Sequence, residues 1–350
     1  MKKLIALLLA AMMVLALVAC GEAEPAATEA PETEGTAAAT EGTAAATEAT
    51  TGESTEAKTY TIGICQFLPH PALDKATEGF MDAVKAELGE ANVTFDLQDA
   101  AGEASNCATI VNGLVASNVD LIMANATPAV AAAYNATEII PILGTSVTEY
   151  GVALGIDNFS GTVGENVSGT SDLADLALQA QMIVDWVPDA QKVALLYCSA
   201  EANSKYQVDV VKAELEAKGL ECDTFAFADT SDLMSNVQEA VAYGDVIYVP
   251  TDNTVANNAT AIDSIARPAG IPIIAGEVGI CANCGIATMS IDYYDLGYET
   301  GMMAVEILRD GADITQMPIR YAPEVTYQYN AEICAELGIT PLEGYEAIEG

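Results

Sequence analysis

The sequence predicts an α/β protein built from two doubly wound lobes, each with a parallel sheet at its centre. From residue 59 onward, short apolar runs rich in β-branched residues alternate with segments of helical periodicity. Near-continuous apolar strands separated by helices indicate a parallel sheet covered on both faces. The alternation runs through twice, on either side of a Gly- and Ser-rich stretch at 155–171, and two rounds indicate two lobes.

Each round supplies strands and helices in order. The first round contains expected strands at 60–65, 92–97, 120–123, 139–143 and 152–156, with helices at 71–88, 103–117 and 128–135. The second contains expected helices at 172–186, 203–218, 231–242 and 253–267, with strands at 192–197, 221–227, 245–249 and 271–274. A strand at 286–291 and a helix at 293–310 come too late for a simple second lobe, so we expect the chain to cross back there. The expected lobes are 59–169 with about 279–318, and 170–278 with about 319–350.

Residues 1–20 have the pattern of an export signal. Lys2 and Lys3 precede an apolar run, 4–17, that is too short for a typical membrane-spanning helix. The run ends in LVACG at 17–21, which resembles the lipobox of bacterial lipoproteins. The resemblance implies cleavage before Cys20 and acyl chains on that residue, which hold the protein at the outer face of the cell membrane. An ordinary cleaved signal with a chance cysteine is the alternative.

The next segment, 21–58, is built from Ala, Thr, Glu, Gly and Pro and repeats one short phrase. It has nothing with which to form a core, and repulsion between its glutamates keeps it open. We expect a disordered acidic tether that lifts the folded part off the membrane.

The charge balance excludes some partners. The net charge is −39, and the few basic residues of the folded part are scattered. Nucleic acid requires a basic footprint, so we expect no nucleic-acid partner and no direct adhesion to anionic lipid. An acidic, soluble surface accounts for the charge without any ligand.

The cysteines suggest chemistry only at one place. Cys281 and Cys284 have the spacing of a redox or zinc pair. A zinc site needs two further ligands, and His70 is the only histidine, so we expect neither a metal nor a cofactor. A local disulfide and two free thiols both remain open.

Polar residues gather where the expected strands end. Ligands of open parallel sheets bind beyond the carboxyl ends of the strands. The candidates there are Gln66, Phe67, His70, Asp74, Ala126, Thr127, Thr145, Thr148, Ser171, Asp172, Glu201, Asn203, Ser204, Thr251, Asp252, Asn253, Glu277 and Asp292. Helix capping alone explains many of them singly. The runs 201–204 and 251–253 hold more polar groups than one cap uses.

The charges of this set indicate a ligand type. Helix N-termini favour a carboxylate, whereas Glu201, Asp252, Glu277 and Asp292 could hold a cation. Lys205 is the one basic residue beside these clusters, so a phosphate or a dicarboxylate is poorly served. A zwitterion fits better. Aromatic surface could come from Phe67, Tyr293 and Tyr294, for which core packing is the alternative.

Several motifs together resemble a known family. They lie at 66–74, 126–128, 169–172, 199–204, 248–254 and 291–298, and the longest are QF..HPALD, YVPTDNT and IDYYDLGY. They resemble the ABC-transporter substrate-binding lipoproteins that are often labelled tryptophan or aromatic amino-acid binders. The resemblance implies a type I periplasmic-binding fold with a three-strand hinge, and a permease and an ATPase as partners of a monomeric receptor.

Other functions stay open at this point. A sugar or nucleoside receptor of the same fold would favour flanking tryptophans, and Trp186, the only one, lies late in a helix. A ligand sensor without transport has the same sequence features. An enzyme would depend on His70 and Asp74 as an acid–base pair, and no nucleophile motif accompanies them, so we expect no catalysis.

Overall fold

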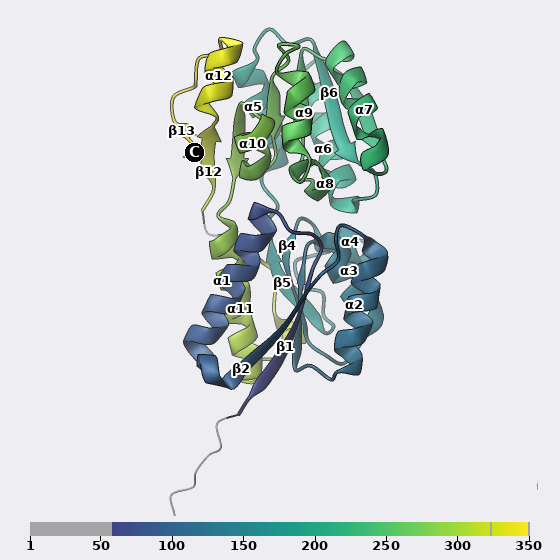
Figure 1. Ribbon diagram of the computed structural model, residues 1–350, viewed down its shortest axis with the longest axis vertical. Helices are drawn as coiled ribbons and strands as arrows, with labels where there is room; N and C mark the ends of the chain where they lie inside the picture. The colour runs from purple at the N-terminus through teal and green to yellow at the C-terminus, as the bar shows by residue number, and fades with distance from the viewer. Residues whose placement is uncertain (1–57, 323, 349–350) are drawn as a thin grey trace, which may run out of the picture. The chain divides into compact units, whose positions relative to one another are not determined.

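The computed structural model describes residues 58–322 and 324–348, which form one compact unit. The expected export signal, the lipid-bearing Cys20 and nearly all of the tether lie outside the described residues. None of the helices in the described part is long and apolar enough to cross a membrane. The chain forms two sheets with helices packed on both faces of each, which confirms the predicted α/β class (Figure 1).

The first sheet has six strands, all paired in parallel, and defines lobe 1. Their order is β11 (Arg320–Tyr321), β5 (Val167–Ser171), β4 (Ile142–Val147), β3 (Leu121–Asn125), β1 (Tyr60–Gln66) and β2 (Val93–Asp99). On one face pack α1 (Pro71–Leu88) and α11 (Tyr293–Leu308), and on the other α2 (Ala104–Ala116) and α3 (Thr127–Ala136). A separate apolar cluster fills the space on each face, as a doubly wound sheet requires.

The second sheet has seven strands and defines lobe 2. Their order is β13 (Glu346–Ala347), β12 (Thr326–Tyr329), β10 (Ala287–Ser290), β9 (Ile273–Ala275), β8 (Val246–Val249), β6 (Lys192–Cys198) and β7 (Glu221–Phe227). One face carries α5 (Leu176–Trp186), α6 (Ala202–Ala217) and α12 (Ala331–Leu337). The other carries α7 (Thr230–Tyr243), α9 (Ala259–Ala266) and α10 (Val278–Cys284). The β10–β12 pair is antiparallel.

The chain passes between the lobes three times, after β5, after β10 and between β11 and β12. The boundary expected near residue 279 therefore needs correction. Residues 278–290 form α10 and β10 and belong to lobe 2, because the apolar strand Ala287–Ser290 is paired on both sides within the second sheet. The boundary expected at residue 319 also shifts, since β11 pairs with β5 of lobe 1.

One expected strand is a helix. Residues 152–156 overlap α4 (Tyr150–Leu154), where the Glu149 side chain accepts from the Val152 N–H and Gly155 ends the turn with φ 69°. Its place in the sheet is taken by β5, inside the Gly- and Ser-rich stretch expected to be a crossing. Gly169 permits this pairing, because a Cβ there would collide with the Gly144 backbone. The expected helix 253–267 is also broken, into α8 (Asn253–Ala256) and α9.

Small residues bring α1 and α11 together along most of their length. A Cβ on Gly297 would collide with the Ala76 carbonyl oxygen, and one on Gly79 with the Tyr294 carbonyl oxygen. Because both helices begin at the same end of lobe 1, this close contact fixes His70, the N-cap of α1, and Tyr293, the first residue of α11, next to lobe 2.

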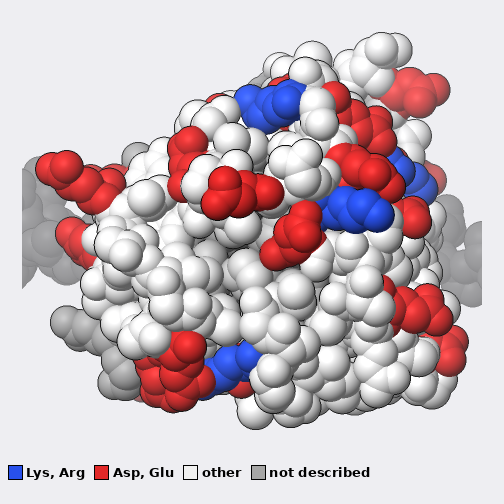
Figure 2. Space-filling model, turned by 90° about the horizontal axis from the view of Figure 1, so that it is seen from above, with Lys and Arg blue, Asp and Glu red and all other residues white. Residues whose placement is uncertain are grey.

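Basic side chains on the described surface are mostly neutralised by acidic neighbours. Arg267 contacts Asp263, Glu332 and Glu336, and Arg320 contacts Glu299 and Glu306. On the face shown in Figure 2, Asp and Glu predominate and the Lys and Arg side chains lie against them. The acidic balance expected from the sequence is thus visible as an acidic surface.

Candidate functional site

A nearly closed cavity with about 10 Å³ of free space lies where the carboxyl ends of strands from both lobes meet. Lobe 1 contributes the start of α1, the residues after β4 and the start of α11, and lobe 2 the starts of α6 and α8 and the residue before α10. Its lining comprises His70, Leu73, Ser146, Thr148, Asp172, Asn203, Thr251, Asp252, Asn253, Ala256, Glu277 and Tyr293. It is the strand-end site that the parallel sheets predict.

Eight of the residues predicted from the sequence line this cavity: His70, Thr148, Asp172, Asn203, Thr251, Asp252, Asn253 and Glu277. The sequence does not single out Leu73, Ser146 or Ala256. Leu73 lies one turn after His70, and Ser146 lies near the end of β4, in the polar run that follows the strand expected at 139–143, so the position of each could have indicated it. Tyr293, which was expected to be aromatic surface or core, lines the cavity with a buried ring.

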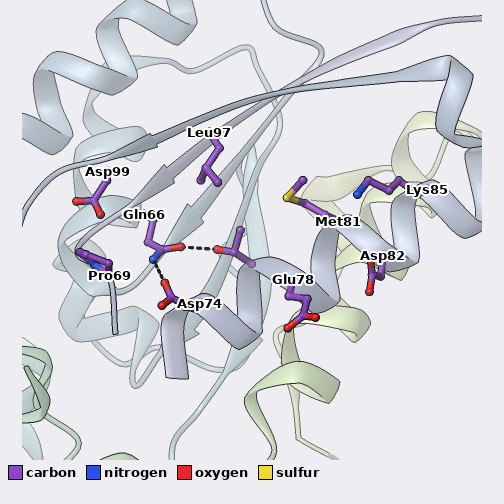
Figure 3. A pocket seen from close by; sticks show the side chains of 10 residues that line it. Gln66, Pro69, Asp74, Glu78, Met81, Asp82, Lys85, Leu97 and Asp99 are labelled. Atoms are coloured by element: carbon purple, nitrogen blue, oxygen red, sulfur yellow. Dashed lines mark hydrogen bonds between the residues drawn. The ribbon is translucent and has the colours of Figure 1, made fainter. Parts of the chain in front are cut away.

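Other predicted residues lie away from it. The Gln66 amide donates to Asp74 and to the Leu68 carbonyl and accepts from the Thr77 hydroxyl. Figure 3 shows Gln66 and Asp74 in a separate lobe 1 groove beside Met81 and Leu97. The remaining residues outside the cavity are Phe67, Ala126, Thr127, Thr145, Ser171, Glu201, Ser204 and Asp292. Phe67 and Glu201 line a larger groove of about 520 Å³.

Three buried carboxylates of lobe 2 accept hydrogen bonds from backbone N–H groups. Asp252 accepts from Cys198 at 2.7 Å and from Val255 at 2.8 Å. Glu277 caps α10 through the N–H groups of Gly279 and Ile280. Glu201 accepts from Asn253 and Thr254, so it caps α8 from the start of another helix. Every oxygen of these three carboxylates has a partner.

The structure gives Asp172 a different position. One of its oxygens accepts from the Tyr293 hydroxyl at 3.1 Å, and the other has no hydrogen-bond partner among the described residues. Burial raises the pKa of Asp172 to about 6, against the smaller, lowering effects of the nearby Thr148 and Tyr293 side chains. A buried carboxylate with a free oxygen favours a cation beside it.

Two more acceptors in the cavity have no partner within the described ranges. They are the Ser146 Oγ and the Asn203 Oδ1, and both residues are buried. The Asn203 amide nitrogen donates to the Thr251 carbonyl at 3.1 Å, so its oxygen is the atom left free. Ser146 has φ 54°, and the β4–β5 register shifts between Gly144 and Val147. Such irregular backbone is frequent at functional sites.

Two helices begin at the cavity without a side-chain cap. The N-caps of α1 and α6 are His70 and Glu201, and neither makes a capping hydrogen bond. By contrast, α8, α10 and α11 are each capped by a carboxylate. The partial positive charge of the first two N-termini is therefore not neutralised by their own caps.

The cysteine pair lies in the core of lobe 2. Cys281 and Cys284 are buried free thiols on α10 and pack in the same apolar cluster as β8 and β9. Burial raises the pKa of Cys281, so its thiol stays protonated. Of the two possibilities left open by the sequence, the structure has the free thiols.

Comparisons with known proteins agree with this architecture. Residues 61–345 match the family model described as ABC transporter substrate binding protein. A curated tyrosine-binding protein of Clostridioides difficile (strain R20291) is 33% identical over 287 residues, which is 81% of this chain and 83% of that protein. A conserved domain protein of Vibrio cholerae is 27% identical with a TM-score of 0.79, over 83% of this chain and all of that one.

Two solved structures of nearly the same sequence identity differ in how well they superpose on this one. The ABC domain from Streptococcus pneumonia in complex with L-Trp is 32% identical and has a TM-score of 0.79, covering 83% of this chain and 100% of that one. A ligand-free, open substrate-binding protein from Clostridium difficile is 33% identical over 83% of this chain and 99% of that one, with a TM-score of 0.64. The present structure is therefore more similar to the L-Trp complex than to the open one.

Proposed function

The chain belongs to the family of ABC transporter substrate-binding proteins, and from this premise we propose that it binds an amino acid, most suitably an aromatic one, between its two lobes. Members of the family are binding proteins, and those of importers work outside the cytoplasm. The names of two relatives, one binding tyrosine and one solved with L-Trp, support an amino acid as the ligand.

The observation that carries the proposal is the set of three unpaired acceptors in the cavity. They are the free oxygen of Asp172, the Asn203 Oδ1 and the Ser146 Oγ. A buried acceptor without a hydrogen bond costs about 1–3 kcal/mol, so the site gains when a ligand supplies donors. An ammonium group has three N–H donors and a positive charge for the carboxylate. We therefore assign the ligand's α-ammonium to these three side chains.

The other groups of an amino acid also find partners. The uncapped N-termini of α1 and α6 are suited to the α-carboxylate. Leu73, Ala256 and the Tyr293 ring offer apolar surface for the side chain. With about 10 Å³ of free space the cavity is nearly closed, so an amino acid would enter only after the lobes move apart.

The N-terminal segment bears on where the protein works and with which partners. We propose that acyl chains on Cys20 and the tether keep the receptor at the cell membrane, where it meets a permease and its ATPase. Tethering raises the effective concentration of receptor at the permease without any added contact. Substitution of Cys20 by Ala should release the protein into the medium in a fractionation experiment. Unchanged membrane association would contradict the anchor.

A calorimetric screen of the purified chain tests the ligand class. The panel comprises tyrosine, tryptophan, phenylalanine, leucine, several sugars and several nucleosides. We expect binding of one or more aromatic amino acids and no heat from sugars or nucleosides. Binding of sugars or nucleosides alone would overturn the proposal and support a receptor of the same fold with another cargo.

A further inference from the structure

One buried hydrogen bond joins the two lobes across the cavity. The His70 Nε2 lies 3.1 Å from the Asn253 Oδ1, and both side chains are buried. His70 precedes α1 in lobe 1, and Asn253 begins α8 in lobe 2. Because the two residues belong to different lobes, the bond exists only when the lobes are together.

Lobe 2 fixes the orientation of the asparagine. The Asn253 amide nitrogen donates to Glu201 at 2.6 Å, and its backbone N–H donates to the same oxygen at 3.1 Å. The other Glu201 oxygen accepts from the Thr254 N–H and hydroxyl. With its nitrogen committed to Glu201, Asn253 presents only an acceptor to lobe 1. His70 must therefore be the donor, with its proton on Nε2.

Lobe 1 fixes the histidine as well. Pro69 and Pro71 flank His70 and restrict the backbone on both sides. Its backbone is extended, with φ −157° and ψ 160°, and its carbonyl accepts from the Asp74 N–H at 2.9 Å. The backbone that carries the imidazole is thus held by contacts within lobe 1, as the Asn253 amide is held within lobe 2.

Glu277 of lobe 2 lines the same cavity as His70. Burial raises the pKa of Glu277, and His70 has a smaller, lowering effect on it. Both oxygens of Glu277 remain engaged in capping α10, so His70 retains Asn253 as its hydrogen-bond partner.

We propose that His70 and Asn253 form a latch that stabilises the closed arrangement of the lobes and so sets the rate of ligand release. The inference rests on the proposed function of the cavity as the ligand site. It goes beyond that function because the latch joins protein to protein. A bond made only in the closed state raises the population of that state, which lowers the dissociation rate of whatever the cavity holds.

Three variants test the latch on the purified full chain. His70→Ala and Asn253→Ala each remove it, and His70→Gln keeps an N–H donor at a similar distance from the backbone. We expect the first two to raise the dissociation rate of the amino acid about tenfold, as loss of one buried hydrogen bond predicts, and His70→Gln to restore much of the difference. The double variant His70→Ala/Asn253→Ala should release ligand no faster than the worse single variant.

A second measurement separates the latch from a direct ligand contact. Spectroscopic labels at Ile139 in lobe 1 and Leu178 in lobe 2, both exposed, report the distance between lobes in ligand-free protein. His70→Ala should shift the distances toward longer values. Asn166→Ala is the matched control, because the Asn166 amide donates only to the carbonyl groups of Thr137 and Ile140, which both belong to lobe 1. It should change neither the distances nor the dissociation rate.

The outcomes are distinguishable. Unchanged lobe distances together with faster release in His70→Ala would mean that His70 holds the ligand directly, and would overturn the latch. Unchanged release in both alanine variants would overturn it as well. A wild-type chain that binds no amino acid would contradict the proposed function, while the ligand-free distances would still decide the latch.

Discussion

Four buried carboxylates around the cavity have different roles, which depend on what each oxygen contacts. Asp252, Glu277 and Glu201 have both oxygens on N–H groups: those of Glu277 and Glu201 cap helix starts, and Asp252 joins the start of α8 to Cys198 at the end of β6. Asp172 keeps one oxygen free and turns the other toward Tyr293. A carboxylate oxygen that does not cap a helix is free to accept a hydrogen bond from a ligand. Binding should therefore depend on Asp172.

The pKa of Asp172 gives binding a pH dependence. Burial raises this pKa to about 6, so below that pH the ligand-free protein carries a proton on Asp172. An ammonium ligand requires the ionised form, so the proton must leave on binding. The dissociation constant should rise about tenfold per pH unit below pH 6 and level off above it. Calorimetry across this range measures it, and a flat profile would contradict the assignment.

The raised pKa of Asp172 affects the free energy of unfolding in the opposite direction. A carboxyl whose pKa is raised in the folded state binds its proton more tightly there than in the unfolded chain. Its contribution therefore disfavours folding as pH rises from about 4 through about 6. Binding and stability should respond to pH in opposite directions at this residue.

Asp252 should behave as a structural residue. Asp252→Ala leaves the buried N–H groups of Cys198 and Val255 without their acceptor. We expect the free energy of unfolding to fall by about 1–3 kcal/mol in urea denaturation, with the order of preference among ligands unchanged. Asp295→Ala, at an exposed site in the first turn of α11, is the control. A variant as stable as the wild type would show that the cap has no importance.

Residue types and strand ends could predict which side chains come to the site, but not which atoms remain free there. Asp252 and Asp172 both follow strands and are alike in sequence. Their difference depends on contacts between distant segments, such as Glu201 reaching the α8 backbone more than fifty residues away. Ser146 was missed because its exposure to the cavity comes from a register shift between strands.

At the scale of elements, the α1–α11 pair holds the lobe 1 half of the site. Gly297→Ala would place a methyl group against the Ala76 carbonyl oxygen, which belongs to the backbone and cannot move aside. We expect a loss of about 1–3 kcal/mol in the free energy of unfolding, despite the better helix propensity of alanine. Urea denaturation measures the change.

The chain offers a matched control for that substitution. Gly113 lies in α2 with open space around its Cα. Gly113→Ala should stabilise the protein by about 0.5–1 kcal/mol, because alanine favours helix and meets no atom. Equal effects of the two substitutions would show that the contact between α1 and α11 is not as tight as the structure indicates.

Periodicity predicted most elements and failed where tertiary contacts decide. The helix Pro71–Leu88 and the strand Glu221–Phe227 have the predicted bounds. The residues 152–156 are apolar enough for a strand, but the Glu149 cap and Gly155 make them the end of a helix. In β5 the composition predicts a loop, and only pairing with β4 at Gly169 makes it a strand.

At the scale of the whole molecule, three crossings of the chain connect the two lobes, and a cavity lies between them. The family resemblance predicts the number of crossings, but the position of each crossing depends on which sheet each strand joins. The cavity needs both lobes, because Asp172 and Asn203 come from opposite sides of it. We therefore expect ligand binding and lobe closure to be coupled.

Asp172 should hold the ammonium of the bound amino acid. The most direct measurement compares the bound aromatic amino acid with its analogue lacking the amino group, in the wild type and in Asp172→Asn, by calorimetry. The wild type should bind the amino acid at least about a hundredfold more tightly than the analogue, and Asp172→Asn should lose most of that preference, while Asp295→Asn should keep it. If Asp172→Asn retains the full preference for the amino group, Asp172 does not hold the ammonium.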